Sequence, residues 1–349
     1  MLVAMYYGQN DIRIEDMPVP EIGPGELLIR TVASGICGSD VMHWYRAGKT
    51  PLVLGHEIAG EIAAVGADVD SYTIGDRISA SHHVPCNTCH YCLNGHHTVC
   101  DTLRSTHFFP GGFSEYIRLP AINVDRGVYR LPDEMSFEEA TFIEPLACVY
   151  RGQRMVHSGV GKSVLVLGSG ISGILHVQLA RAWNASPVIV TDINPNRLEA
   201  AERFGADAVI DAGENITESL KKINKGRLAD IVILTTGAEE AIQQAIRSVE
   251  RGGTVLFFAS SEHDITVPLP VHDLFWRNER TLTSSYAANY KEHMAALKLI
   301  HQGKINVRDM VTHRLPLTDA AKGFQLVESA RDSLKVIIEP NVKDSKKTG

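Results

Sequence analysis

The fold of the second half of this 349-residue chain is decided by one stretch, Val164-Leu165-Val166-Leu167-Gly168-Ser169-Gly170-Ile171-Ser172-Gly173. Four apolar residues typical of a buried strand lead directly into a G-x-G-x-x-G pattern that opens a helical stretch. Gly168 permits a tight turn, Gly170 lets the backbone approach a pyrophosphate, and Gly173 lets helix and strand pack closely. The pattern predicts a strand, a turn and a helix whose N-terminus binds phosphate groups.

A second strand follows at the distance that dinucleotide binding needs. Val188–Thr191 ends at Asp192, nineteen residues after Gly173, and a carboxylate there accepts hydrogen bonds from ribose hydroxyl groups. The carboxylate would repel a 2′-phosphate, so we expect NAD rather than NADP, with the nearby Arg197 able to offset part of that repulsion. The alternative is a structural glycine-rich turn in which Asp192 caps a helix. Strand, spacing and acid together favour an NAD site.

The rest of the chain divides by its pattern into two kinds of structure. Strand-like runs alternate with helical stretches after residue 160, which predicts a doubly wound parallel sheet of the Rossmann type over 151–285. Short apolar runs between frequent turn signals predict a β-rich structure in 1–150. Lys291–His301 is typical of a helix and Leu334–Glu339 of a strand. We therefore expect a domain formed by 1–150 and 286–349, interrupted by an α/β domain.

Composition argues against several other classes of protein. The formal net charge is −7, and no block of Lys and Arg suggests binding to nucleic acid. The short basic run Lys343–Lys347 is expected to be a solvated end of the chain. No run of about 18 apolar residues predicts a membrane span, and no signal-peptide pattern opens the sequence. We expect a cytoplasmic protein, in which clustered cysteines bind metal or act in catalysis rather than form disulfides.

Cys86, Cys89, Cys92 and Cys100 follow the spacing C-x2-C-x2-C-x7-C. Four thiolates close a tetrahedral shell around zinc and leave no open position, so this ion would be structural and would cross-link the lobe 81–101. An iron–sulfur cluster is the competing metal group, but the ferredoxin spacing with a following Cys-Pro is absent. The neighbouring histidines are interpreted as surface residues: His82, His83, His90, His96, His97 and His107.

A second set of donors is spread along the chain. Cys37 lies in the segment G-I-C-G-S-D, His56 and Glu57 follow in G-H-E, and Glu144 lies in F-I-E-P-L. A thiolate, an imidazole and a carboxylate can hold zinc while leaving a position for water or substrate, as catalysis requires. Singly, they have ordinary interpretations: a small core residue, a turn histidine and the end of a helix that begins near Ser136. The combination favours a catalytic zinc site.

Taken together, these motifs resemble the zinc-dependent medium-chain dehydrogenase family, most closely its sorbitol (polyol) dehydrogenase branch. The matching segments occur in family order and cover nearly the whole chain: 37–40, 55–57 with Gly60 and Gly66, 75–77, the cysteine quartet, 144–146, 168–173 and Asp192. The resemblance implies an α/β fold in which the Rossmann sheet accompanies a β-rich GroES-like catalytic domain. It also implies an oxidoreductase acting on a small-molecule alcohol, and a homotetramer or homodimer.

The resemblance also assigns metal ligands. Cys37, His56 and Glu57 correspond to ligands of the catalytic zinc, and Glu144 to a residue that binds either the zinc or its water. Which of Glu57 and Glu144 binds the ion directly stays open. With the cysteine quartet, two zinc ions per chain are expected, one catalytic and one structural.

For the reaction, the resemblance implies hydride transfer from the alcohol carbon to nicotinamide, with zinc as a Lewis acid on the alcohol oxygen. Ser39 matches the hydroxyl that relays the alcohol proton, with His43 beyond it. The expected cofactor contacts are Gly168, Gly170, Ile171, Ser172, Gly173, Asp192, Arg197, Phe258, Ala259, Ser260, Ser285 and Tyr286.

The chain departs from the polyol branch at two places. His43 stands where a tyrosine is usual, and Ala287 and Ala288 stand where the branch carries an Arg-Tyr pair. These departures argue against sorbitol itself and leave another polyol, sugar alcohol, cyclitol, sugar acid or simple secondary alcohol open. The alternative enzyme is an L-threonine 3-dehydrogenase-like amino-alcohol dehydrogenase. A zinc-free quinone reductase-like protein or a non-catalytic NAD-binding module would lack the set of catalytic zinc ligands.

Overall fold

The structure, a computed structural model, describes residues 1–342 of the chain. These residues divide into two compact units. The first contains Met1–Ala147, Ala287–Gly303 and the chain from Val307 onward, and the second contains Cys148–Tyr286 and Lys304–Asn306. The boundaries predicted from the sequence are 150/151 and 285/286, and that prediction assigned 304–306 to the first domain. The basic run Lys343–Lys347 lies outside the described residues.

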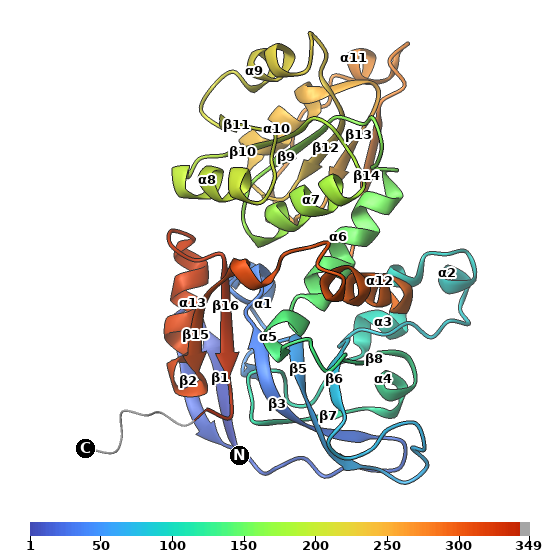
Figure 1. Cartoon of the computed structure of the whole chain (residues 1–349), viewed down its shortest axis with the longest axis vertical. Helices are drawn as coiled ribbons and strands as arrows, with labels where there is room; N and C mark the ends of the chain where they lie inside the picture. Colours follow the sequence, from blue (N-terminus) through green and yellow to red (C-terminus); the bar gives the residue numbers. More distant parts are fainter. Residues whose placement is uncertain (343–349) are drawn as a thin grey trace. The chain divides into compact units, whose positions relative to one another are not determined.

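The second unit is built on six parallel strands (Figure 1). Their order across the sheet is β11 (Ala208–Asp211), β10 (Val188–Asp192), β9 (Val164–Leu167), β12 (Ala229–Leu234), β13 (Val249–Phe257) and β14 (Thr281–Ser284). The chain starts in the middle at β9 and winds outward in both directions, which is the doubly wound Rossmann order. The predicted fold class is confirmed.

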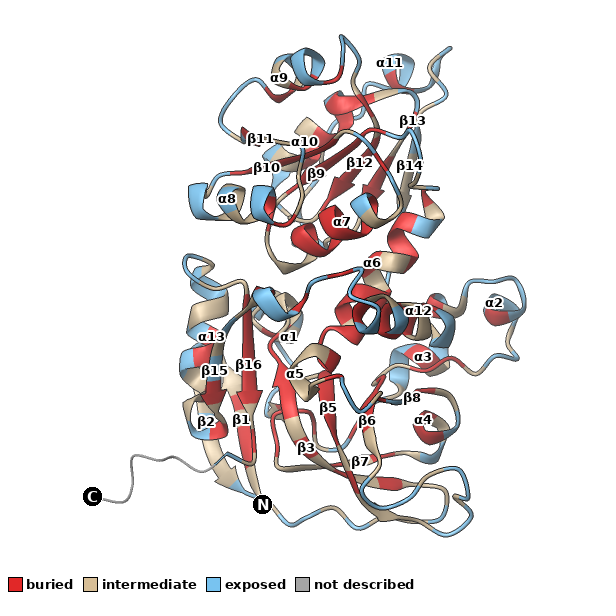
Figure 2. Cartoon of the chain, viewed as in Figure 1, coloured by how far each residue is buried: buried red, intermediate tan, exposed pale blue. Residues whose placement is uncertain are grey.

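Helices connect these strands and pack against the sheet. They are α7 (Ile171–Ala182), α8 (Pro195–Arg203), α9 (Ile216–Ile223), α10 (Glu239–Ser248) and α11 (Val271–Phe275). All four residues of β9 are buried, as Figure 2 shows for the central strands. A continuous apolar run with both faces covered is what a central parallel strand requires.

The first unit contains two sheets. The larger has the order β15 (Val311–Pro316), β16 (Lys335–Glu339), β3 (Leu27–Gly35), β5 (Glu57–Val65), β6 (Arg77–Ala80) and β8 (Val128–Arg130), with β7 (Tyr116–Leu119) also paired to β3. The smaller consists of β2 (Asp11–Asp16), β1 (Leu2–Gly8) and β4 (Leu52–Val53). All pairs are antiparallel except β15 with β16. This agrees with the predicted β-rich character of the unit.

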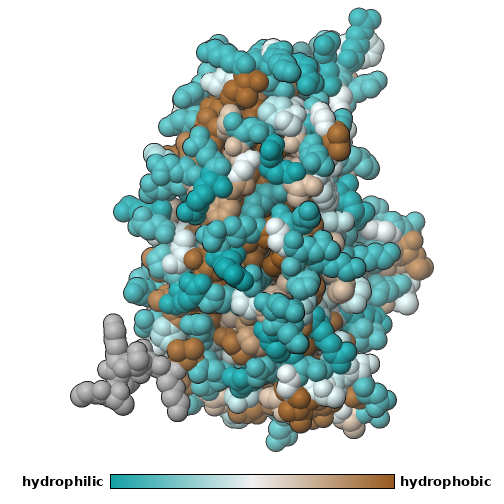
Figure 3. Space-filling view, viewed as in Figure 1, coloured by the Kyte–Doolittle hydropathy of each residue, from teal (hydrophilic) through white to brown (hydrophobic). Residues whose placement is uncertain are grey.

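Short helices connect the strands of the first unit: α1 (His43–Arg46), α2 (His90–Leu93), α3 (Asp101–Ser105), α4 (Ala121–Arg126), α5 (Phe137–Ala140), α12 (Tyr290–His301) and α13 (Ala320–Ser329). Helix α6 (Ile143–Met155) begins in the first unit and ends in the second. Glu144 lies in the first turn of α6 rather than at the end of the helix that Ser136 caps, which is α5. Most side chains on the face drawn in Figure 3 are hydrophilic, with apolar ones scattered among them.

Candidate metal centres and cofactor site

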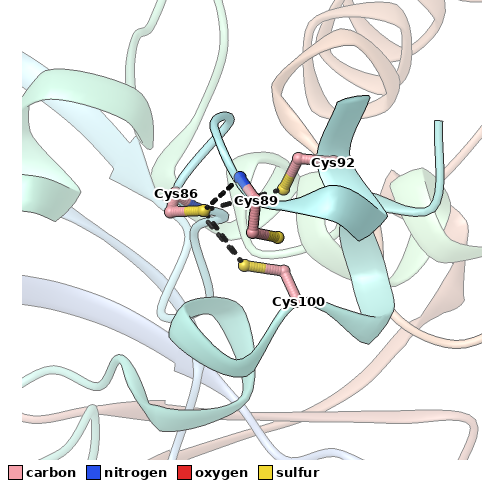
Figure 4. A group of neighbouring side chains, drawn as sticks. All are labelled: Cys86, Cys89, Cys92 and Cys100. Carbon is pink, nitrogen blue, oxygen red and sulfur yellow. Dashed lines mark hydrogen bonds between the residues drawn. The ribbon is translucent and has the colours of Figure 1, made fainter. Parts of the chain in front are cut away.

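The four cysteines of the quartet converge in a loop of the first unit. Their sulfur atoms all lie within 4.8 Å of one another and point toward a common centre (Figure 4). The Sγ atom of Cys86 is 3.6 Å from that of Cys100 and 4.0 Å from that of Cys92. Four sulfurs at a zinc–sulfur distance of about 2.3 Å would stand about 3.8 Å apart in a tetrahedron. The quartet therefore has nearly the dimensions of a zinc–thiolate site.

Hydrogen bonds around the quartet favour ionised sulfur. The N–H groups of Thr88 and Cys89 donate to Cys86 Sγ at 3.4 and 3.2 Å. Hydrogen bonds from Thr88 and then from Cys89 lower the pKa of Cys86 to about 5. Burial, in contrast, raises the pKa of Cys92 to about 12. The apolar core around the quartet is small: it consists of Leu103, Cys92 and Cys100, with Cys86, Cys89 and Ala287 packed against them.

A second donor group also forms in the first unit. The Cys37 sulfur, a His56 ring nitrogen and a Glu57 carboxylate oxygen all lie within 4.8 Å of one another. Strand pairing brings them together, because β3 and β5 are antiparallel with Gly35 opposite Glu57. Cys37 follows the end of β3 and His56 precedes the start of β5. Residues nineteen positions apart in sequence thus become neighbours across one sheet edge.

A buried carboxylate organises this group. Asp40 has no exposed side-chain surface and accepts hydrogen bonds from the Cys37 N–H at 3.0 Å and from Arg46 at 3.1 Å. One of its oxygens lies 3.5 Å from His56 Nδ1. Burial lowers the pKa of His56, but Asp40 and then Cys37 outweigh burial and raise it well above the usual value. The negative surroundings therefore attract positive charge to this point.

Glu57 is part of a buried ion pair that sequence analysis did not identify. The Lys335 ammonium group, at the start of β16, donates to one Glu57 oxygen, and both side chains are almost fully buried. Lys335 also lies 3.4 Å from the carbonyl oxygen of Ile36. A Cβ atom at Gly35 would collide with both charged groups, so glycine lets the ion pair lie against this strand. The one sequence signal was a lysine within the largely apolar predicted strand Leu334–Glu339.

The other predicted catalytic residues take different positions. Glu144 is not part of the three-residue donor group, but it belongs to the charges that, after burial, raise the pKa of Tyr129. Ser39 is half-buried, and its hydroxyl lies 3.4 Å from the Arg46 guanidinium. His43 is exposed at the start of α1.

The prediction that the nearby histidines lie on the surface is wrong for His82 and His83. The His82 ring centroid is 4.8 Å from that of His56 and 3.8 Å from that of His83. Nδ1 of His83 is 2.9 Å from the Thr106 carbonyl oxygen, and burial lowers the pKa of His83 to about 4. Strand β6 ends at Ala80 and carries the next residues inward, which spacing to the cysteines could not show.

The glycine-rich turn of the second unit is tight and closely packed. Gly168 has a φ of +96°, and a Cβ atom on Gly173 would collide with the Gly168 carbonyl oxygen. Asp192 accepts hydrogen bonds from the N–H and hydroxyl of Ser169 at 2.7 and 2.9 Å, and from the Asn194 N–H at 2.9 Å. These contacts fix the carboxylate beside the turn.

The remaining predicted cofactor residues lie at the same edge of the sheet. The Arg197 guanidinium is 3.9 Å from the position that a Cβ atom on Gly170 would take, and its Nε is buried without a partner among the described residues. The segment 258–260 follows β13, and Ser285 and Tyr286 follow β14. The carboxyl ends of parallel strands form the ligand-binding edge of such sheets. No helix within residues 1–342 is both long and apolar enough to cross a lipid bilayer.

Comparisons with known proteins agree with this architecture. The chain matches two family models, "Alcohol dehydrogenase GroES-like domain" over 23–133 and "Zinc-binding dehydrogenase" over 172–302. It is 32% identical to sorbitol dehydrogenase of Bacillus subtilis over 98% of each chain. It is 33% identical to L-threonine 3-dehydrogenase of Rhizobium etli, covering 97% of this chain and 99% of that one. A structure described as a zinc-binding dehydrogenase from Sinorhizobium meliloti, bound to NADP, superposes with a TM-score of 0.87 and 27% identity, covering 97% and 99% of the two chains.

Proposed function

The chain belongs to the zinc-binding alcohol dehydrogenase family and is an oxidoreductase; on that premise, we propose that it interconverts a secondary alcohol and its ketone by hydride transfer with NAD. The observation that most supports this is the convergence of Cys37, His56 and Glu57. Three protein ligands leave one tetrahedral position for a substrate oxygen, whereas the four cysteines of the quartet leave none. We therefore assign a catalytic zinc to the first group and a structural zinc to the second.

The residues present fit a divalent cation. The donors are a thiol, an imidazole and a carboxylate, which suit zinc, and the buried Asp40 adds negative charge beside them. Lys335 engages one oxygen of Glu57, which leaves the second oxygen for the metal, so we assign Glu57 rather than Glu144 as the direct ligand. When bound, zinc would polarise the alcohol oxygen as a Lewis acid.

The protein's own groups would move the proton. Ser39, two residues beyond Cys37, would accept the hydroxyl proton of the alcohol and pass it outward. His43 is exposed and lies four residues beyond Ser39, so it would take the proton from there to solvent. Arg46 holds the backbone carbonyl of Ser39 at 3.0 Å, which fixes the position of this segment.

The cofactor preference would follow from Asp192. Its three hydrogen bonds within the chain leave acceptor capacity, because a carboxylate offers about four lone-pair sites. A ribose hydroxyl would use that capacity, and a 2′-phosphate would meet a negative charge. The positive charge of Arg197 would offset part of this repulsion. The Sinorhizobium meliloti structure, which has a similar fold, is bound to NADP. The substitution Asp192→Ala should weaken the binding of NAD far more than that of NADP. An equal loss of affinity for both cofactors would contradict this assignment.

The substrate would be a polyol, sugar alcohol, cyclitol or sugar acid. Relatives named sorbitol dehydrogenase and D-xylulose reductase support this class. The similarity to L-threonine 3-dehydrogenase favours an amino alcohol as the alternative. The test is a panel of these compounds with the zinc-loaded protein and NAD or NADP, followed by the absorbance of reduced nicotinamide. Turnover of L-threonine alone would favour the alternative, and no turnover of any alcohol would contradict the proposal.

The enzyme would act as a homodimer or homotetramer. Strand β14 lies at the edge of the six-stranded sheet, and the adjoining segment exposes Val271, Phe275 and Trp276. An uncovered edge beside apolar side chains is a common site of self-association. Light scattering coupled to size exclusion would measure the mass, and a monomer at micromolar concentration would contradict this part of the proposal.

A further inference from the structure

Two buried imidazole nitrogens of the first unit have no hydrogen-bond partner among the described residues, Nδ1 of His82 and Nε2 of His293. Buried polar atoms are almost always paired, so an unpaired one calls for an explanation such as a bound water or ligand. Packing alone does not explain why a histidine stands at position 293. The His293 ring lies flat on that of Tyr129, with ring centroids 5.1 Å apart and an angle of 3° between the ring planes. A phenyl ring would stack equally well in that place.

His82 lies beside the proposed catalytic metal site. Its ring centroid is 4.8 Å from that of His56, and its carbonyl oxygen accepts a hydrogen bond from the Asn123 side chain at 3.1 Å. It is nevertheless not one of the donors that lie within 4.8 Å of one another. His82 is therefore a neighbour of the proposed zinc rather than one of its ligands.

His293 belongs to the same region of the first unit. Its ring stacks on Tyr129 of β8, and Tyr129 lies opposite Ser79 in the pairing of β8 with β6. His82 follows the end of β6 at Ala80 by two residues. Nδ1 of His293 lies 2.9 Å from the Asn289 carbonyl oxygen, and because a carbonyl only accepts, Nδ1 carries the proton. Burial lowers the pKa of His293 to about 4, so Nε2 is an unprotonated acceptor at neutral pH. Such an acceptor binds a hydroxyl group and repels a carboxylate or a phosphate.

We propose that His82 and His293 form a hydroxyl-binding pair that selects substrates with hydroxyl groups beyond the one that is oxidised. The inference rests on the proposed alcohol oxidation and narrows it. Polyols and cyclitols fit this pair, whereas the anionic group of a sugar acid or a sugar phosphate would face the lone pair of His293 Nε2. The two histidines would supply recognition in a chain that has Ala287 and Ala288 in place of an Arg-Tyr pair.

The test compares xylitol with 2-pentanol, a five-carbon pair that differs in the number of hydroxyl groups. Binding is measured by titration calorimetry on the zinc-loaded protein saturated with NADH, which offers no hydride acceptor, and kcat/KM is measured with NAD. His82→Phe and His293→Phe keep an aromatic ring and remove the nitrogens. Each should lower the xylitol to 2-pentanol ratio of kcat/KM by roughly tenfold or more and weaken xylitol binding by a similar factor.

Two conservative variants separate recognition from packing. His82→Asn places an amide near the level of Nδ1, and His293→Gln places one near the level of Nε2, so both should retain most of the selectivity. His107→Phe replaces an exposed imidazole and should leave the ratio unchanged. If a phenylalanine variant fails to fold, the amide variants and the wild-type preference in calorimetry still decide the matter.

Several outcomes would overturn the inference. They are an unchanged ratio in the phenylalanine variants, an equal loss for both alcohols, or a wild-type protein that binds 2-pentanol at least as tightly as xylitol. A protein that binds xylitol through these two residues but oxidises no alcohol would contradict the proposed function and leave this inference standing.

Discussion

The cysteine quartet and the Cys37, His56 and Glu57 group are both proposed zinc sites in the same unit, yet they are assembled over different distances along the chain. The quartet comes from one loop, and the N–H groups that donate hydrogen bonds to its sulfur atoms belong to the same loop. The other group lies where two paired strands meet. Its members contact Asp40 and also Lys335, which lies near the far end of the chain. The comparison suggests that a structural site depends on local spacing, whereas a catalytic site depends on the whole sheet around it.

The two proposed zinc sites should differ most in their effect on activity, which is tested by removing one ligand of the catalytic group. Cys37→Ser should lower kcat/KM by about a thousandfold or more, because the metal's stabilisation of developing charge amounts to several kcal/mol. The bound zinc should fall from two ions per chain to one, with little change in the melting temperature. Retained activity with one zinc would show that the reaction does not use this site.

Removal of a ligand from the quartet should affect stability first. Cys100→Ala should release the structural zinc and lower the free energy of unfolding by on the order of 3 kcal/mol, since metal binding contributes directly to folding. Denaturant unfolding measures this change. The kcat of folded molecules that retain the catalytic zinc should change much less than in the Cys37 variant. An equal loss of kcat in both variants would erase the distinction between the two sites.

The ion pair behind Glu57 offers a finer test. Lys335→Met removes the charge that orients the carboxylate, and loss of such a partner typically lowers metal affinity by about 10- to 100-fold. Competition with a chelator should show this loss at the catalytic site and none at the quartet. A higher affinity would mean that Lys335 competes with the metal for Glu57 instead of positioning it.

The smallest expected effect is on the stability of the metal-free protein, to which the two sites should contribute with opposite pH dependences. The raised pKa of His56 contributes stability below the unfolded value of 6.5, and this is lost as the pH rises through the folded value. The Cys86 pKa, lowered to about 5 from 9.0, contributes stability that is complete above 9 and is lost as the pH falls through about 5. His56→Gln should therefore cost more stability at about pH 6 than at about pH 9, and Cys86→Ser the reverse. Urea unfolding would detect either trend, and parallel trends would contradict the comparison.

The sequence predicted what local chemistry determines. The glycine-rich turn with Asp192, the cysteine spacing and the strand–helix alternation each depend on residues close together in the chain. Helix α9 is only about two turns long, so Asn215 and Glu218 at its start are nearly its whole sequence signal. Strand β13 begins at Val249 because that residue pairs with Ala229 across an irregularity in the ladder, a start that no local pattern marks.

The surroundings of the catalytic group were not predictable in the same way. Lys335 meets Glu57 only because β16 pairs with β3, and the unpaired nitrogens of His82 and His293 arise from burial that no spacing reveals. Strand pairing also places Glu57 beside Cys37 and His56, which supports the proposal that Glu57 rather than Glu144 is the direct ligand. Long-range pairing, rather than local pattern, determines these contacts.

The most direct test of the central claim is a crystal of the zinc-loaded protein measured at the zinc absorption edge. If both sites bind zinc, two anomalous peaks per chain will appear, one inside the quartet and one about 2.3 Å from the sulfur of Cys37 and about 2.0 Å from a ring nitrogen of His56. A single peak in the quartet, with none between Cys37 and His56, would contradict it.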